Sequence, residues 1–239
     1  MNGLLAAFAF MTRIPMPRVA YETDLSKAAP WLPVAGAAIG AAVAAAVIFG
    51  AIVNPWIGAL LGLIVWVLLT GALHIDGLGD VADGLGAAHG SPDRFVEVAR
   101  DPHLGSFGAV AIALQLMAKL VLLAVLADHA TALELAIGVA LVAAWARWVP
   151  LLLARAVPPL TEGLGSRLAA GVGMPAVIGT GALLAVASLL ASPILLVALP
   201  LSGLFALYWR WKLGGVTGDC HGASIEVMES MLLFALISI

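Results

Sequence analysis

The residues best suited to chemistry lie in the segment His74 to Gly86, which reads HIDGLGDVADGLG. Asp76, Asp80 and Asp83 are spaced i, i+4 and i+7, so on a helix their carboxylates share one face. Neighbouring carboxylates repel one another, and a divalent cation among them removes that repulsion. Oxygen ligands that leave room for water and phosphate suit Mg²⁺ or Mn²⁺. The spacing predicts a metal site for a phosphate substrate, with His74 orienting a carboxylate or phosphate; the plainer alternative is a solvated acidic turn.

Two further segments carry candidate partners of that site. RDPHLGSFG contains Asp101, which we expect to be a fourth metal ligand or a general base, although an aspartate before proline is often only a turn residue. Arg94 precedes it and either binds phosphate oxygens or serves as surface charge. Near the start of the chain, FMTRIPMP places Arg13 where it can contact a phosphate or lipid headgroups.

Four other polar residues are weaker candidates for substrate binding. Lys119 and Arg147 fall inside apolar segments, where a charge faces a polar cavity or a partner within the protein. For Arg147, a cation–π contact with its flanking tryptophans is the alternative. Glu162 lies in TEGLG, and Asp219 lies in GGVTGDCHGA, whose backbone N–H groups can cradle a phosphate in front of a helix.

The composition of the chain determines which elements can position these residues. The 239 residues are 63% apolar and 10% charged, whereas soluble domains are about 45–50% apolar and about 25% charged. The mean hydropathy is +1.10. A net charge of −3 offers no basic surface for nucleic acid, and the one cysteine, Cys220, excludes an intrachain disulfide and a cysteine-rich metal site. We therefore expect an all-α, polytopic membrane protein with one catalytic transmembrane domain over residues 1–239, not a soluble enzyme or a disordered regulator.

About seven segments are long and apolar enough to cross a membrane, which takes about 20 residues. The last carries Glu226 and Glu229 near its start, so six spans with a docked C-terminal helix is the alternative. The first 11 residues lack a leading positive charge, which predicts an interfacial or half-inserted helix instead of a cleaved signal. The expected spans are 34–53, 55–75, 106–127, 131–154, 171–191, 193–209 and 224–239.

The placement of charges agrees with seven spans. Lys and Arg total 11; Lys119 and Arg147 fall within spans, and the other nine all fall on the side of the N-terminus. Of 14 carboxylates, only Asp128 and Glu134 fall at an outer loop. By the positive-inside rule the charged side is cytoplasmic, so we expect the site to face the cytoplasm.

These motifs, in this order and over almost the whole chain, resemble those of the cobalamin synthase family, also called adenosylcobinamide-GDP ribazoletransferases. The acidic motif and the final glycine motif are specific, whereas EGLG by itself is not. His221 departs from the family pattern, in which an apolar residue such as leucine is expected. The matching pieces are FMTRIPMP, HIDGLGDVADG, RDPHLGSFG, EGLG and GGVTGDCHGA.

The resemblance implies a Mg²⁺-dependent multi-pass enzyme of the bacterial inner membrane. It would join adenosylcobinamide-GDP to α-ribazole or its 5′-phosphate, releasing GMP, in the assembly of coenzyme B12. Its partners would be these small molecules and the lipid bilayer, with no nucleic acid, and a homo-oligomer or an association with other corrinoid enzymes is a further expectation. In such phosphoryl transfer, we expect Asp76, Asp80, Asp83 and Asp101 to hold Mg²⁺, and the substrates to contact Arg13, His74, Arg94, Lys119, Arg147, Glu162 and Asp219.

Three other classes of protein are alternatives. CDP-alcohol phosphotransferases also gather aspartates at a membrane face, but their signature resembles DGx2ARx8Gx3Dx3D, and the Ala-Arg pair is missing after Asp76 and Gly77. An ion-coupled transporter would account for Lys119 and Arg147, but it predicts repeats and paired polar segments at mid-membrane, which the sequence lacks. A non-catalytic scaffold leaves the three aspartates unexplained.

Overall fold

The computed structural model is a bundle of helices, and it describes residues 2–22, 25–88, 90–163, 166–167 and 171–238. Over these residues the only extended pairing is an isolated parallel bridge between Pro159 and Val216. The elements are α1 (Asn2–Met11), α2 (Arg18–Glu22), α3 (Leu25–Ala28), the 3₁₀ helix η1 (Ala29–Trp31), α4 (Leu32–Ala51), α5 (Pro55–Thr70), α6 (Leu73–Ala88), α7 (Pro92–Val98), α8 (Ser106–His129), α9 (Ala132–Ala156), α11 (Met174–Ala191), the 3₁₀ helix η2 (Pro193–Val197), α12 (Ala198–Leu213) and α13 (Gly218–Ile237).

The expected polytopic architecture is confirmed. Six helical segments are long and apolar enough to cross a membrane, and α5 and α6 qualify only together, as a pair bent by 85°. The short apolar helix α1 corresponds to the expected N-terminal element. The six segments are Ser26–Ala51, Ser106–His129, Ala132–Ala156, Met174–Ala191, Pro193–Leu213 and Gly218–Ile237.

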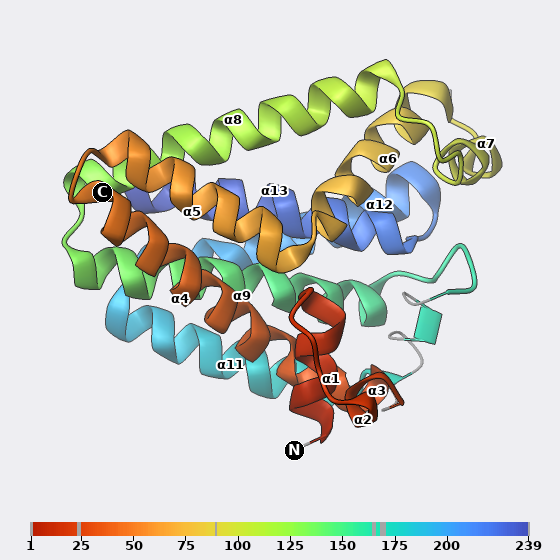
Figure 1. Cartoon of the computed structure of the whole chain (residues 1–239). Helices are drawn as coiled ribbons and strands as arrows, with labels where there is room; N and C mark the ends of the chain where they lie inside the picture. Colours follow the sequence, from red (N-terminus) through yellow and green to blue (C-terminus); the bar gives the residue numbers. More distant parts are fainter. Residues whose placement is uncertain (1, 23–24, 89, 164–165, 168–170, 239) are drawn as a thin grey trace.

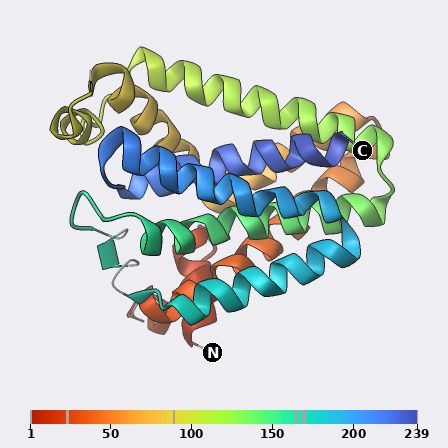
Figure 2. The same cartoon turned by 180° about the vertical axis from the view of Figure 1, so that it is seen from behind.

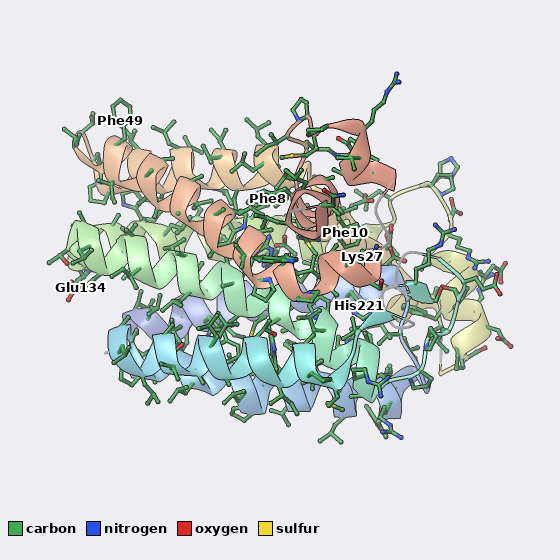
Figure 3. The ribbon with its side chains drawn as sticks, turned by 90° about the horizontal axis from the view of Figure 1, so that it is seen from below. Phe8, Phe10, Lys27, Phe49, Glu134 and His221 are labelled. Carbon is green, nitrogen blue, oxygen red and sulfur yellow. The ribbon has the colours of Figure 1, made fainter. Side chains whose placement is uncertain are left out.

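The long helices α8, α9, α11 and α13 run side by side, and α4 and α5 cross them obliquely (Figure 1). Seen from behind, α12 lies over α13 and beside α9 (Figure 2). The helices α1 to α3, α7 and the α12–α13 connection gather at one end (Figure 1), which we call the polar end. Figure 3 shows Lys27 and His221 toward this end, and Phe49 and Glu134 at the opposite end.

Close packing at the centre follows from the small residues of α4. Gly36 and Gly40 lie directly against the backbone of α9, and a Cβ atom at either position would collide with a carbonyl of that helix. Close approach of backbones is the usual use of glycine between membrane helices. The helix α9 is therefore enclosed on this side by α4, with α11 and α13 as further neighbours.

The expected continuous span 55–75 is wrong, because the helix ends at Thr70. Gly71 takes a left-handed conformation with φ of 60°, as does Ala72. The N–H groups of these two residues bond back to the carbonyls of Leu68 and Val67, which is how a glycine commonly ends a helix. The chain then turns by 85° into α6, so the acidic motif lies on a separate helix that leans across the bundle.

The last span begins earlier than the expected residue 224. Thr217 caps α13 by accepting a hydrogen bond from the N–H of Cys220 at 3.3 Å, and Gly218 already belongs to the helix. The segment expected to be a glycine-rich loop is therefore largely the first turns of α13. Asp219 and His221 consequently sit on the same rigid helix as Glu226 and Glu229.

Candidate functional site

The acidic face of α6 meets the start of α13 at the polar end of the bundle. A Cβ atom on Gly77 would lie 3.1 Å from the Cα atom of Asp219, so the two helices touch at that point. Asp80 lies near enough to Asp76, Asp83 and Asp219 for the four charges to repel one another. The structure thus adds Asp219 to the predicted acidic triplet.

Asp76 and Asp80 carry no basic partner and no hydrogen-bond donor among the residues that the structure describes. Asp76 is exposed and Asp80 is half-buried, so their oxygen atoms can be reached from outside. Carboxylates held together without a counter-charge favour the binding of a cation.

Asp83, in contrast, is already engaged. Its Oδ2 accepts the backbone N–H of Gly105 at 2.7 Å, and its Oδ1 accepts that of Gly108 at 2.9 Å. Both positions need glycine, because a Cβ atom at either would collide with the Asp83 carboxylate. Asp83 therefore fastens the first turn of α8 to α6, satisfying N–H groups that a helix start leaves unpaired.

The donor set fits Mg²⁺ bound together with phosphate. Over the described ranges, no three His, Cys, Asp or Glu side chains converge closely enough to hold a metal ion by themselves. Mg²⁺ is usually bound through one or two carboxylates, several waters and phosphate oxygens, so it does not need such a cage. Asp76 and Asp80, with Asp219 opposite, offer oxygen ligands of this kind.

Arg13 lies at the bend between α5 and α6. Its N–H donates to the carbonyl of Leu69 at 2.8 Å, and its side chain covers Gly71 so closely that a Cβ there would collide with it. The side chain is exposed, and α6 with Asp76 starts from the same bend. A cation at this place can pair with a phosphate that lies against the acidic face.

Asp101 lies on the loop between α7 and α8. It accepts the backbone N–H of His103 at 3.0 Å and contacts the Nδ1 of the same residue at 2.7 Å. These hydrogen bonds, the backbone one foremost, hold the pKa of Asp101 below its usual value. Asp101 and Asp83 line one cavity of about 390 Å³, so the loop borders the acidic face.

Arg94 and Glu162 lie farther out. Arg94 is exposed on α7 and pairs with Glu97 at 2.7 Å. Glu162 is exposed, and the last two residues of its TEGLG motif, 164 and 165, lie outside the described residues. The N–H of Leu160 donates to the carbonyl of Val216, and the N–H of Val216 donates to the carbonyl of Pro158, which keeps the Glu162 loop beside the start of α13.

Comparison with known proteins identifies the family. The model of the family described as cobalamin-5-phosphate synthase matches residues 3–237. The chain belongs to this family. An adenosylcobinamide-GDP ribazoletransferase from Thiobacillus denitrificans is 46% identical, with 98% of this chain and 94% of the relative covered. Enzymes of the same name from Novosphingobium aromaticivorans and Laribacter hongkongensis are 44% and 43% identical, covering 99% and 100% of this chain and 96% and 98% of theirs.

Membership of the cobalamin-5-phosphate synthase family makes the chain a membrane-embedded transferase of cobalamin biosynthesis. The match extends almost from end to end, which decides against the CDP-alcohol phosphotransferase, the transporter and the scaffold. No solved structure matches this member of the family.

A second polar cluster lies deeper in the bundle, and the sequence pointed to only half of it. Lys119 and Arg147 are buried, and both bind glutamates of α13: Lys119 contacts Glu226 at 2.5 Å and also Glu229, and Arg147 contacts Glu229. Trp66 donates to Glu229 at 3.2 Å. Of the two predicted surroundings for these cations, a polar cavity or a partner within the protein, the structure shows the partner for both. The sequence held a signal for this pairing, because Glu226 and Glu229 fall in the last expected span and can balance the charges of the two buried cations.

This buried network joins four helices, α5, α8, α9 and α13. Lys119 also lies over the ring of Trp66, with Nζ 4.6 Å from the centroid. A substrate contact of Lys119 or Arg147 stays a prediction, and their observed contacts hold α13 in place.

Proposed function

We propose that the protein transfers α-ribazole, or its 5′-phosphate, onto adenosylcobinamide-GDP in a Mg²⁺-dependent reaction that releases GMP. The observation that carries the proposal is the meeting of Asp76, Asp80 and Asp219 from two helices, with no basic partner for Asp76 or Asp80 in the described chain. The names of the relatives supply the corrinoid and the ribazole.

The reaction moves one phosphoryl group. A ribose hydroxyl of the ribazole attacks the pyrophosphate phosphorus on the corrinoid side, and a new P–O bond forms. The P–O bond toward the guanosine moiety breaks, GMP leaves with the electron pair, and the hydroxyl proton passes to a base. Such a transfer depends on positioning and on neutralising charge more than on covalent help.

The residues of the site fit this task. Asp76, Asp80 and Asp219 would hold Mg²⁺, which supplies Lewis-acid charge to the pyrophosphate oxygens. Arg13 adds a positive charge at the bend next to them. Asp83 keeps the start of α8 against α6, which holds the acidic face in shape.

Asp101 suits a charge-bearing role better than that of a base. A carboxylate with a lowered pKa accepts protons poorly near neutral pH. Arg94 and Glu162 stay as predicted phosphate and substrate contacts from the bordering loops.

We further propose that the enzyme lies in the bacterial inner membrane with this site facing the cytoplasm. The basic residues outside the buried network lie in the short helices, helix ends and connections toward the polar end, and the opposite connections, at 52–54, 130–131 and 192, carry none. The positive-inside rule assigns such an end to the cytoplasm.

The test is GMP release by the detergent-purified protein from adenosylcobinamide-GDP and α-ribazole 5′-phosphate, with and without Mg²⁺. We expect Mg²⁺-dependent release with a cobalamin product, and a fall in rate on the order of 100-fold in Asp80→Asn at an unchanged unfolding temperature. Asp93→Asn, an exposed aspartate of α7, is the matched control. A fully active Asp80→Asn variant, or no release by folded protein, would overturn the proposal.

A further inference from the structure

A small, partly open cavity lies next to the acidic face. This cavity of about 150 Å³ is bounded by the end of α1, the start of α6, α9 and the first turns of α13. Its walls are mainly apolar and include Phe10, Leu73 and Pro150. An apolar cavity of about 150 Å³ in another protein binds benzene, whereas drug-sized ligands need about 300–1,000 Å³. The cavity therefore has room for one ring system and not for a whole nucleotide or a corrin.

Two histidines line this apolar space. His74 and His221 line the cavity and are 3% and 8% exposed. In the described part of the chain, Nε2 of His74 and Nδ1 of His221 have no hydrogen-bond partner. Buried polar atoms in proteins are nearly always paired, so two residues that line one cavity and each carry a buried, unpaired nitrogen favour a ligand with a polar atom.

The cavity borders the acidic face, where we propose that phosphoryl transfer takes place. Asp219 lines the cavity and lies beside Asp80 on the acidic face. Gly222 packs against His74, where a Cβ would lie 3.2 Å from the His74 carbonyl oxygen, so the two histidine-bearing helices are held together. Phe10 and His221, both labelled in Figure 3, reach the cavity from opposite ends of the chain.

We propose that this cavity receives the heteroaromatic base of the ribazole nucleoside, with His74 and His221 as its polar contacts; the inference rests on the proposed function. The base of ribazole is a benzimidazole, which is flat and largely apolar and has one unsubstituted ring nitrogen that accepts a hydrogen bond. A neutral imidazole can donate that bond. With the base in the cavity, the ribose lies toward Asp219, where its hydroxyl meets the pyrophosphate.

The other base in the reaction fits less well. Guanine carries several donors and acceptors along its edge, and a mostly apolar cavity with two imidazole nitrogens would leave some of them unpaired, which is costly. The benzimidazole nitrogen can pair with one of the two imidazoles, whereas a lipid chain would pair with neither. The polar lining therefore favours a benzimidazole-like ring over both alternatives.

Steady-state kinetics of substituted enzymes test the assignment. His74→Leu or His221→Leu, whichever removes the donor to the single ring nitrogen, should raise the KM for α-ribazole about 3- to 10-fold, the range of one hydrogen bond, with the KM for adenosylcobinamide-GDP unchanged. His74→Gln and His221→Asn keep a polar atom near the lost nitrogen and should recover most of the effect. His129→Ala, an exposed histidine at the opposite end, is the control. A rise in the corrinoid KM alone, or no change in either KM, would overturn the proposal.

A binding measurement separates this proposal from the proposed function. Ligand-detected NMR titrations would compare 1-methylbenzimidazole with 1-methylindole, which has the same shape but lacks the acceptor nitrogen. We expect the benzimidazole to bind about 3- to 10-fold more tightly, and the preference to vanish in His74→Leu or in His221→Leu, whichever removes the donor. Selective binding without GMP release would support the cavity assignment and refute the reaction. Release of GMP with equal or no binding of the two rings would refute the cavity assignment alone.

Discussion

Replacing Glu229 by glutamine should strongly destabilise the bundle. The side chain is fully buried, and its carboxylate contacts Lys119, Arg147 and the indole N–H of Trp66. Glutamine keeps the shape and removes one negative charge. Two buried cations then face one remaining anion, Glu226.

The structure sets the size of this effect. Removing one member of a buried ion pair costs about 3–5 kcal/mol, because the partner charge stays buried without compensation. For a chain of this length each kcal/mol lowers the unfolding temperature by about 2–4 °C, so Glu229→Gln should unfold about 6–20 °C below the parent protein. Adding Arg147→Met removes the surplus cation, and the double variant should recover at least half of the loss.

Thermal unfolding in detergent, followed by tryptophan fluorescence, measures both variants. Glu97→Gln is the control, since this exposed glutamate of α7 pairs with the exposed Arg94, and such pairs contribute about 0–1 kcal/mol. If Glu229→Gln unfolded within the range of the control, or the double variant were as unstable as the sum of the two single changes, the network would not be the ion balance described.

Asp83→Asn should lower the unfolding temperature by several degrees, because it replaces an acceptor of two backbone hydrogen bonds and costs about 1–3 kcal/mol; equal midpoints for Asp83→Asn and Asp80→Asn would contradict this division of roles. Gly40→Ala should cost about 1–3 kcal/mol, because its Cβ would strike a carbonyl of α9, whereas Gly203→Ala meets open space and should be neutral or stabilising in the same unfolding measurement. The hydrogen bonds from His103 lower the pKa of Asp101, which keeps it ionised near neutral pH, so GMP release by Asp101→Asn should keep the inflections of the parent pH profile, and a shifted inflection would make Asp101 the base.

Hydropathy was sufficient for the fold class and for the approximate position of the spans, since a run of about 20 apolar residues satisfies its backbone hydrogen bonds in lipid by forming a helix. The bend after Thr70 could not be predicted in the same way. Residues 55–75 form one apolar run, and the left-handed conformation of Gly71 and Ala72 depends on packing of the Arg13 segment over the turn. The early start of α13 was not predicted for a similar reason. Its glycines disfavour a helix by their intrinsic propensity, and contacts with α6 stabilise the helix in the folded protein.

Of the candidate site, periodicity correctly predicted a helix with three aspartates on one face. Periodicity could not tell that Asp83 bonds two backbone N–H groups of α8, because that contact joins residues more than 20 positions apart. Asp219 joined the acidic face only through the crossing of two helices at Gly77. The pairing of Lys119 and Arg147 with the α13 glutamates was within reach of charge counting, but the geometry of the network was not.

The two polar clusters are linked by α13. Asp219 precedes Glu226 by seven residues, about two turns or 10.5 Å along the helix, so a helix anchored by the buried network also fixes the start that carries the site. Gly222 of α13 packs against the backbone of His74, and Gly77 of α6 packs against the backbone of Asp219. These contacts complete the positioning of α13 without a polar bond at the acidic face itself. Because other residues hold the helices in place, the carboxylates of Asp76 and Asp80 can face each other without a basic partner in the described chain. That arrangement leaves their charge available for a cation and the phosphates of a substrate.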